Sequence, residues 1–193
     1  SAGQKVYLGG FSGGLLRSQT GTKYTIDLIT DRGANTEPTS KPSSDGTVDS
    51  GAEPTIYRPY PLPEWGPEQV SIEVNILTGK SKITNRFRLL GMDDKPLSGL
   101  SPPRNMDSTP VSRQEIPIDL YGRLLTPDPN GFDSESMAPD PLERGDWIGS
   151  EYAPELALFK DGRMLVKLSP ANIFPKEWAN RIENRGLEGT ATV

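Results

Sequence analysis

Hydrophobic residues recur at every second position over short segments of this chain, an alternation typical of β-strands that bury one face. The clearest case is the segment 69–77, in which four apolar residues alternate with polar ones, namely Val70, Ile72, Val74 and Ile76. Residues 23–30 alternate in the same way, and residues 5–8 form a shorter predicted strand. Residues 115–125 are a further predicted strand, which Pro117 places at a sheet edge or bulge because proline lacks a backbone N–H.

Turn residues between predicted strands indicate two antiparallel hairpins. Residues 78–81 join the strand at 69–77 to a second strand that ends near residue 90. Asp161-Gly162 lies at the centre of the segment 155–168 and suits a type I′ turn, which needs two positive φ angles. The expected register pairs Phe159 with Met164 and Leu158 with Leu165. Both faces of this second hairpin are apolar, so we expect it to be covered on both sides.

Three long segments are dominated by proline, glycine, serine, threonine and short acidic or amide residues; they are 31–66, 91–114 and 126–146. Structureless loops longer than about 12–15 residues are uncommon in compact domains, and are usually functional or held by a partner. We therefore interpret residues 31–66 as an extended arm or long loop, and the other two segments as long connections.

One short helix is predicted near the end of the sequence, with Pro175 in its first turn and Gly186 as its stop. Trp178 and Ile182 share one side of this expected helix. Together the elements predict a single, mainly β domain over residues 1–193. Its expected architecture is an antiparallel sandwich or small barrel, with long Pro/Gly-rich connections and one short C-terminal helix.

The composition removes most catalytic chemistry, since the 193 residues include neither histidine nor cysteine. The commonest general base near neutral pH, the thiolate nucleophile and the soft ligands of zinc are therefore missing. The net charge is −5, from 21 basic and 26 acidic residues mixed along the chain, so no basic run suits a phosphate backbone. No apolar stretch reaches the ~20 residues of a membrane span. We expect a non-enzymatic protein that does not bind nucleic acid and has no membrane span.

Gly10, Ser12 and Gly14 match the G-x-S-x-G pattern in which hydrolases expose a nucleophilic serine. That mechanism needs a base to accept the serine proton, normally histidine, and the chain has none. We therefore interpret residues 10–14 as a flexible glycine turn.

An oxygen-rich run contains the candidate metal ligands Asp128, Asn130, Asp133 and Glu135. Hard cations such as calcium bind several carboxylate and carbonyl oxygens from a tight loop. The spacing departs from an EF-hand, because Gly131 is the fourth residue of the run rather than the sixth. The alternative is a loop whose short polar side chains cap their own backbone. We expect no cofactor other than calcium.

Three aromatic residues, Tyr57, Tyr60 and Trp65, are interleaved with prolines in an extended segment. Proline-rich segments favour the stiff polyproline II conformation, which loses little entropy when it docks in a groove. The segment is therefore a candidate for docking to a partner, and its rings are candidates for stacking on a sugar. The third interpretation is an arm that folds over the edge of the protein's own sheet.

Residues 144–149, Arg-Gly-Asp-Trp-Ile-Gly, are followed at 153–167 by Ala-Pro-Glu-Leu-Ala-Leu-Phe-Lys-Asp-Gly-Arg-Met-Leu-Val-Lys. This stretch resembles a pattern in tailed-phage baseplate hub and spike proteins, where a Gly-Asp-Trp turn leads into a hairpin built around Asp-Gly. The resemblance covers about 25 residues. It implies a small β-barrel, and it assigns no functional residue to this chain.

These observations favour a non-enzymatic structural or attachment component of a large assembly, a virus or phage particle with the chain in its tail, baseplate or capsid. Its expected partners are other protein subunits, in a homo- or hetero-oligomer. The alternative is an extracellular or periplasmic β-sandwich module that binds carbohydrate or calcium. A hydrolase that uses carboxylate chemistry is the third hypothesis, because the many acidic residues make many pairs.

Overall fold

The protein is seen in a computed structural model that describes residues 10–34, 39–40, 56–103, 115–152, 154–180 and 186–192. These residues form eleven strands in three sheets and one 3₁₀ helix. The strands are β1 (Phe11–Thr20), β2 (Lys23–Thr30), β3 (Thr39–Ser40), β4 (Ile56–Pro59), β5 (Glu68–Asn75), β6 (Lys80–Arg88), β7 (Glu115–Ile118), β8 (Ser134–Pro139), β9 (Asp146–Ser150), β10 (Glu155–Lys160) and β11 (Arg163–Leu168). The mainly β fold class is confirmed, and the sheets of the described chain do not close into a barrel.

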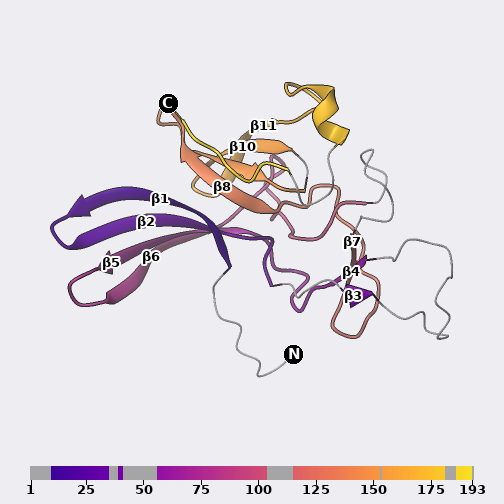
Figure 1. Cartoon of the computed structure of the whole chain (residues 1–193), viewed down its shortest axis with the longest axis horizontal. Helices are drawn as coiled ribbons and strands as arrows, with labels where there is room; N and C mark the ends of the chain where they lie inside the picture. The colour runs from indigo at the N-terminus through magenta and orange to yellow at the C-terminus, as the bar shows by residue number, and fades with distance from the viewer. Residues whose placement is uncertain are drawn as a thin grey trace.

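The first sheet is antiparallel, has the order β1-β2-β5-β6, and consists of two long hairpins. Figure 1 shows these hairpins side by side, with their turns projecting well beyond the rest of the described chain. The tight turns place Gly21 and Gly79 at φ +58° and +66°, which glycine adopts without steric cost. The predicted strand at 23–30 and the predicted hairpin around 78–81 are therefore confirmed. We call these four strands the projecting sheet.

The second sheet has the order β11-β10-β9-β8, and β8 packs against β1 and β2. Between the two sheets lies a hydrophobic core of eight buried residues: Ile29, Leu89, Leu97, Phe132, Met137, Ile148, Ala157 and Phe159. Phe132 and Phe159 pack edge to face, with ring centroids 5.8 Å apart. Burying a large apolar side chain contributes about 1.5–3 kcal/mol, so this core is the main source of stability at the junction of the sheets.

The third sheet, β3-β4-β7, combines an antiparallel pair with a parallel one, since β4 and β7 run in the same direction. Pro117 lies in β7, an edge strand of this sheet within the described chain, as its missing N–H requires. The predicted strand at 115–125 is shorter than expected. It ends at Ile118, and the chain then turns before Leu124 bridges back to Ile118.

Five strands of the described chain were not predicted, namely β1, β3, β4, β8 and β9. Residues 10–14 are not a flexible turn, because all but Gly10 belong to β1, where Gly13 packs closely: a Cβ there would lie 3.0 Å from the Ile29 side chain and 3.2 Å from Ser136 Cα. The interpretation of 126–146 as a connection without regular structure is also wrong, since it contains β8. The sequence did not predict β8 because most of its residues are serine, glutamate and proline. Its buried Ser134 is satisfied by donating a hydrogen bond to the Thr30 carbonyl at 2.6 Å.

The hairpin around Asp161-Gly162 is confirmed, and both residues have positive φ angles, 50° and 78°. Phe159 pairs with Met164 as predicted, but Leu158 pairs with Val166 because a bulge shifts the register between Leu158 and Phe159. The expectation that both sides are covered is wrong for β11. Two of its apolar side chains lie at the surface, Leu165 at 44% and Val166 at 37% exposure.

Near the end of the sequence, the structure forms a short 3₁₀ helix over Lys176–Asn180, where the sequence predicted a longer helix. Residues 181–185, which complete the predicted helix, lie outside the described residues, as does the predicted strand at 5–8. The segment 31–66 contributes β3 and β4 to the third sheet. Within the described ranges, no helix is both long enough and apolar enough to cross a membrane.

Candidate functional site

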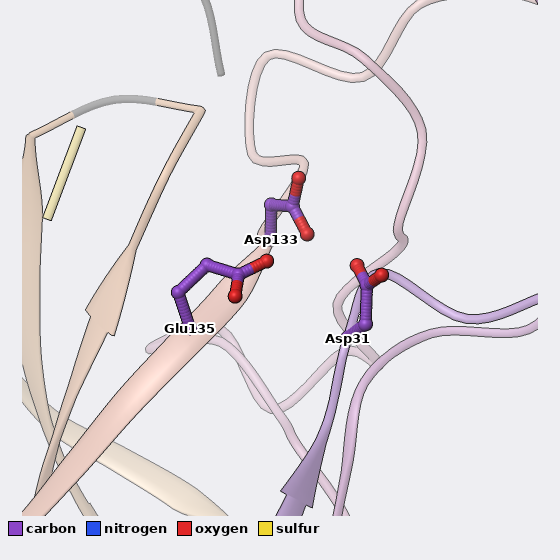
Figure 2. Close-up of side chains that lie close together, drawn as sticks. All are labelled: Asp31, Asp133 and Glu135. Atoms are coloured by element: carbon purple, nitrogen blue, oxygen red, sulfur yellow. The ribbon is translucent and has the colours of Figure 1, made fainter. Parts of the chain in front are cut away.

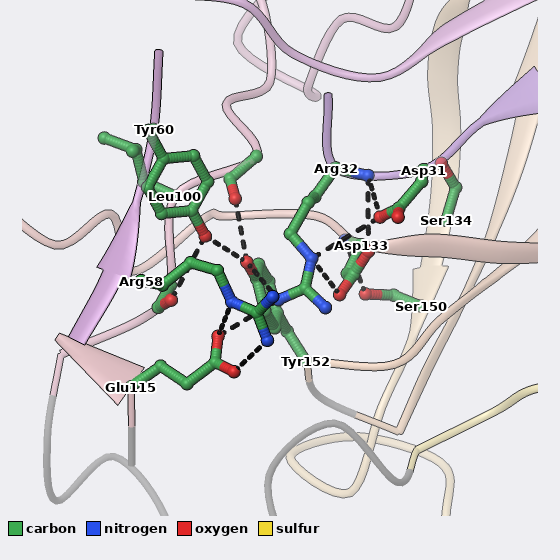
Figure 3. A network of polar contacts seen from close by, with 12 residues as sticks. Asp31, Arg32, Arg58, Tyr60, Leu100, Glu115, Asp133, Ser134, Ser150 and Tyr152 are labelled. Carbon is green, nitrogen blue, oxygen red and sulfur yellow. Dashed lines mark hydrogen bonds and ion pairs between the residues drawn. The ribbon is translucent and has the colours of Figure 1, made fainter. Parts of the chain in front are cut away.

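The densest polar cluster surrounds Arg32, which lies two residues after β2 and is buried. Its Nη1 donates to Glu115 Oε2 at 3.2 Å and to the Tyr152 hydroxyl at 3.1 Å. Its Nε lies 3.0 Å from Asp133 Oδ2, and the guanidinium lies over the Tyr152 ring with its Cζ 5.1 Å from the ring centroid. One cation thus connects the end of β2 with β7, with the start of β8 and with the residues after β9 (Figure 3).

A second buried arginine, Arg58 of β4, shares Glu115 with Arg32. Its Nε donates to Glu115 Oε2 at 2.9 Å, and its Nη2 pairs with Oε1 of the same carboxylate. Glu115 therefore accepts from two guanidinium groups while it is only 6% exposed. Because burial removes the solvation of all three charges, each of them depends on the others.

Two tyrosines complete the cluster. The Tyr60 and Tyr152 hydroxyls are 2.7 Å apart, and Tyr60 also lies 3.3 Å from Ser101 Oγ. Tyr152 donates to the Gly99 carbonyl at 2.8 Å, so it accepts from Tyr60 and from Arg32. We call the seven residues the Arg32 network: Arg32, Arg58, Tyr60, Ser101, Glu115, Asp133 and Tyr152.

Burial and the neighbouring charges fix the protonation states in this network. Burial is the largest influence on Arg32 and disfavours its charged form, but Tyr152, Asp133 and Glu115 outweigh it and raise the Arg32 pKa. Burial also raises the pKa of Tyr60 and of Tyr152, so both hydroxyls stay protonated and can donate. The network therefore combines charged arginines with neutral tyrosines, which is typical of a structural clamp.

An acidic cluster adjoins the network on the side of Asp133 (Figure 2). Asp31, Asp133 and Glu135 each offer a carboxylate oxygen, and these oxygens lie within 4.8 Å of one another. Asp31 follows β2, Asp133 directly precedes β8 and Glu135 lies in β8, so the junction of the two sheets brings them together. Carboxylates at this spacing repel one another, and the Arg32 guanidinium offsets part of this repulsion, with its Nε 3.4 Å from Asp31 Oδ1 and 3.0 Å from Asp133 Oδ2. Clustered carboxylate oxygens are also the ligands that hard cations such as calcium prefer.

Burial first, and then neighbouring carboxylates, raise the pKa of three carboxyl groups in this region. Burial is the main cause for Asp133, and the Arg32 charge opposes it. Burial, followed by the charge of Asp31, raises the pKa of Glu135. The pKa of Glu151 is raised to about 7, by burial first and then by the charge of Glu135, while the charge of Arg32 lowers it. Near neutral pH Glu151 therefore retains part of the proton that it would lose in the unfolded chain.

The structure separates the four residues proposed as calcium ligands. Asp133 and Glu135 belong to the acidic cluster. Asp128 instead accepts a hydrogen bond from the Asn130 amide at 2.9 Å and from Ser98 Oγ at 2.6 Å, which is the self-capping turn weighed as the alternative. The third member of the acidic cluster, Asp31, lies about a hundred residues before Asp133 and Glu135. No sequence pattern marked it as a candidate ligand.

The three aromatic residues of the proline-rich segment do not form one surface. Tyr60 is 2% exposed and belongs to the Arg32 network, so its ring is not accessible to a ligand at the surface. Tyr57 lies in β4, and the Arg86 guanidinium stacks on Trp65 with its carbon 5.3 Å from the ring centroid. In these contacts the segment packs on the protein's own sheets.

No protein-family model matches the chain, and no curated protein or solved structure is significantly similar to it. Function is therefore inferred from the chemistry of this chain's own residues. The contacts of the Arg32 network point to a structural role, because its polar groups are buried and bond one another.

Replacing Glu151 with glutamine tests the proton balance of the acidic region. Because the folded-state pKa is raised, the wild-type free energy of unfolding decreases as the pH rises from about 4.5 to about 7. Glu151→Gln should flatten this decrease and stabilise the protein at pH 7.5 by about 1 kcal/mol, after allowance for solvent screening of a half-buried group. Urea denaturation at pH 5.0 and pH 7.5 measures both effects, and an unchanged difference between the two pH values contradicts the assignment.

Proposed function

We propose that this chain is a non-enzymatic structural or attachment component of a large protein assembly, which it joins through its projecting sheet. A virus or phage particle is the setting favoured by the resemblance at 144–167. Its partners are then protein subunits, and its function comes from contact area rather than from a reactive group.

The observation that carries this proposal is the exposure of the outer half of the projecting sheet. Residues 16–20 of β1 and 80–86 of β6 are exposed. Apolar side chains lie among them and in the adjoining turn, with Leu16 at 56%, Ile83 at 54% and Leu77 at 79% exposure. A sheet normally buries at least one face against another layer. In its working environment this half is therefore expected to be covered by another protein.

The Arg32 network supports the same role. It ties together the residues after β2, the strands β4 and β7, and the segment before β8 by hydrogen bonds and ion pairs. Such a clamp holds the junction of the sheets rigid, so that the projecting sheet points in a fixed direction. Rigid presentation lowers the entropy lost when the surface docks.

Introducing a charge on the exposed apolar side should release the chain from its assembly. The expected result is that wild-type protein, expressed in its native source, sediments with large particles, whereas Leu16→Glu shifts to the slow fractions. Ser18→Glu is the matched control, because Ser18 lies on the same strand, is also exposed, and pairs with Thr25 on the opposite face. Density-gradient sedimentation with immunodetection measures the distribution. Wild-type chain found only as a free protein would contradict the proposal.

Calcium binding is a second candidate, favoured by the convergence of Asp31, Asp133 and Glu135. The denaturation series at pH 7.5 tests it when repeated with millimolar calcium. Binding to the folded state raises the denaturation midpoint, and Asp31→Asn should remove that rise. A midpoint unchanged by calcium rules this candidate out.

A further inference from the structure

We infer that the uncharged face of the projecting sheet docks against the same face of a second copy of this chain. The inference rests on the proposed function and specifies its partner. The outer half of the sheet has two different faces, and the pairing register assigns each side chain to one of them.

The first face is formed by two rows of side chains that cross all four strands. The row nearer the core is entirely aliphatic: Leu16, Ile26, Ile72 and Ile83. The outer row is Gln19, Tyr24, Val74 and Ser81. None of these eight residues is charged. We call them the uncharged face.

The opposite face is built differently. Its rows contain Asp27, Glu73 and Lys82, and the end row adds Lys23 and Lys80. Glu73 and Lys82 form an ion pair at 3.3 Å, and Asp27 pairs with Arg17 at 2.6 Å. Toward the core this same face packs on β8, as the contact of Gly13 with Ser136 shows. This opposite face therefore contacts solvent in its outer part and the second sheet near the core.

The uncharged face ends where the next row begins. That row contains Arg86, whose charge is balanced by Glu68 at 2.6 Å and whose guanidinium stacks on Trp65. Val70, in the same row, is fully buried. The protein therefore covers this side of the sheet near the core, and leaves the two outer rows with Leu16 and Ile83 more than half exposed.

A second copy matches this surface in charge and in shape. A partner that brought charged groups would have to desolvate them against aliphatic side chains without a counter-ion, whereas an identical uncharged face avoids that cost. Two identical sheets also have identical twist, and sheets of equal twist pack face to face with strands about 30° apart. A twofold axis along the strands places Leu16 of one copy near Ile83 of the other, and Ile26 near Ile72, which closes the interface on itself.

The small size of the surface indicates a weak association. The two rows span about four residues of each strand, so four strands about 4.8 Å apart, at about 3.3 Å per residue, give a footprint of about 250 Å² per copy. A stable interface buries about 800 Å² per partner. The isolated chain should therefore form a weak dimer, with a Kd on the order of 0.1 mM, which becomes stable when an assembly adds further contacts.

Sedimentation velocity of the purified full chain from about 10 µM to 1 mM tests the inference. The wild type and Asn85→Glu should associate as concentration rises, whereas Ile83→Glu should remain monomeric or bind at least tenfold more weakly. Both replaced residues lie on β6, are exposed, and gain one negative charge, but Asn85 pairs with Ser71 on the opposite face. A wild type that stays monomeric at 1 mM overturns the inference, as does equal association of the two variants.

A second readout locates the contact. Because the chain has no cysteine, Ile83→Cys and Asn85→Cys each introduce a single labelling site. Maleimide labelling should slow with rising protein concentration at position 83 and stay constant at position 85; constant rates at both overturn the inference. If the purified chain is monomeric but Leu16→Glu still releases it from native particles, the second copy is wrong and the proposed assembly role stands. If the wild type is not in particles, the assembly role fails on its own evidence.

Discussion

Replacing Glu115 with leucine is expected to lower the free energy of unfolding by about 3–5 kcal/mol, because it removes a buried carboxylate that two buried guanidinium groups share. Two buried guanidinium groups, those of Arg32 and Arg58, converge on this carboxylate. Without it they face each other across a site that solvent does not reach. Urea denaturation monitored by tryptophan fluorescence measures the loss.

Two further variants separate the effect of charge from that of lost packing. Glu73→Leu removes a carboxylate from the ion pair with Lys82, whose side chain is 64% exposed, and should cost less than about 1 kcal/mol. The double variant Arg58→Leu/Glu115→Leu removes one buried charge of each sign, so it should lose less stability than the sum of the two single variants. Additive losses, or a Glu115→Leu variant as stable as Glu73→Leu, would show that Glu115 is not the shared counter-ion.

The parts of the fold that the sequence predicts are those set by neighbouring residues. The alternation over 69–77 and the turn that follows it predict β5 and β6, and Asp161-Gly162 predicts the turn between β10 and β11. In each case a local pattern and a turn of known chemistry agree. The register is less secure, because the bulge beside Phe159 depends on packing that the hairpin residues do not encode.

Tertiary contacts decide the elements that the sequence did not predict. Ser134 and Ser136 read as loop residues, but β8 is buried and its serines are satisfied by Thr30 and by Thr190. The Arg32 network has the same origin, since Arg32 and Tyr152 are 120 positions apart and meet only when the sheets assemble. In sequence, an isolated arginine or tyrosine carries no sign of such a partner.

The Arg32 network and the uncharged face lie in different parts of the protein and differ in how their side chains are paired. Near the core, buried charges form ion pairs that connect three sheets. In the outer half of the projecting sheet, the aliphatic row is left without a covering layer in the described chain, so its burial is available for association. Under the proposed assembly role, the buried charges hold the sheets together while the uncharged face provides the contact surface.

Replacing Gly99 with alanine is expected to cost about 3–5 kcal/mol, at the upper end of the range for single substitutions. A Cβ at this position would lie 1.5 Å from the Arg32 carbonyl oxygen and 2.4 Å from its carbon, so one of the two backbones must move. Movement of either would disturb the Arg32 network, because Gly99 also accepts the hydrogen bond of Tyr152.

The matched control is Gly189→Ala, since a Cβ there has no neighbour within 4 Å and the backbone is not in the left-handed region. That variant should stay within about 0.5 kcal/mol of the wild type. Urea denaturation gives both values, and near-ultraviolet circular dichroism reports whether the tyrosine pair keeps its fixed environment. If Gly99→Ala matches Gly189→Ala in stability and spectrum, the backbones of Arg32 and Gly99 are not in the close contact on which the clamp depends.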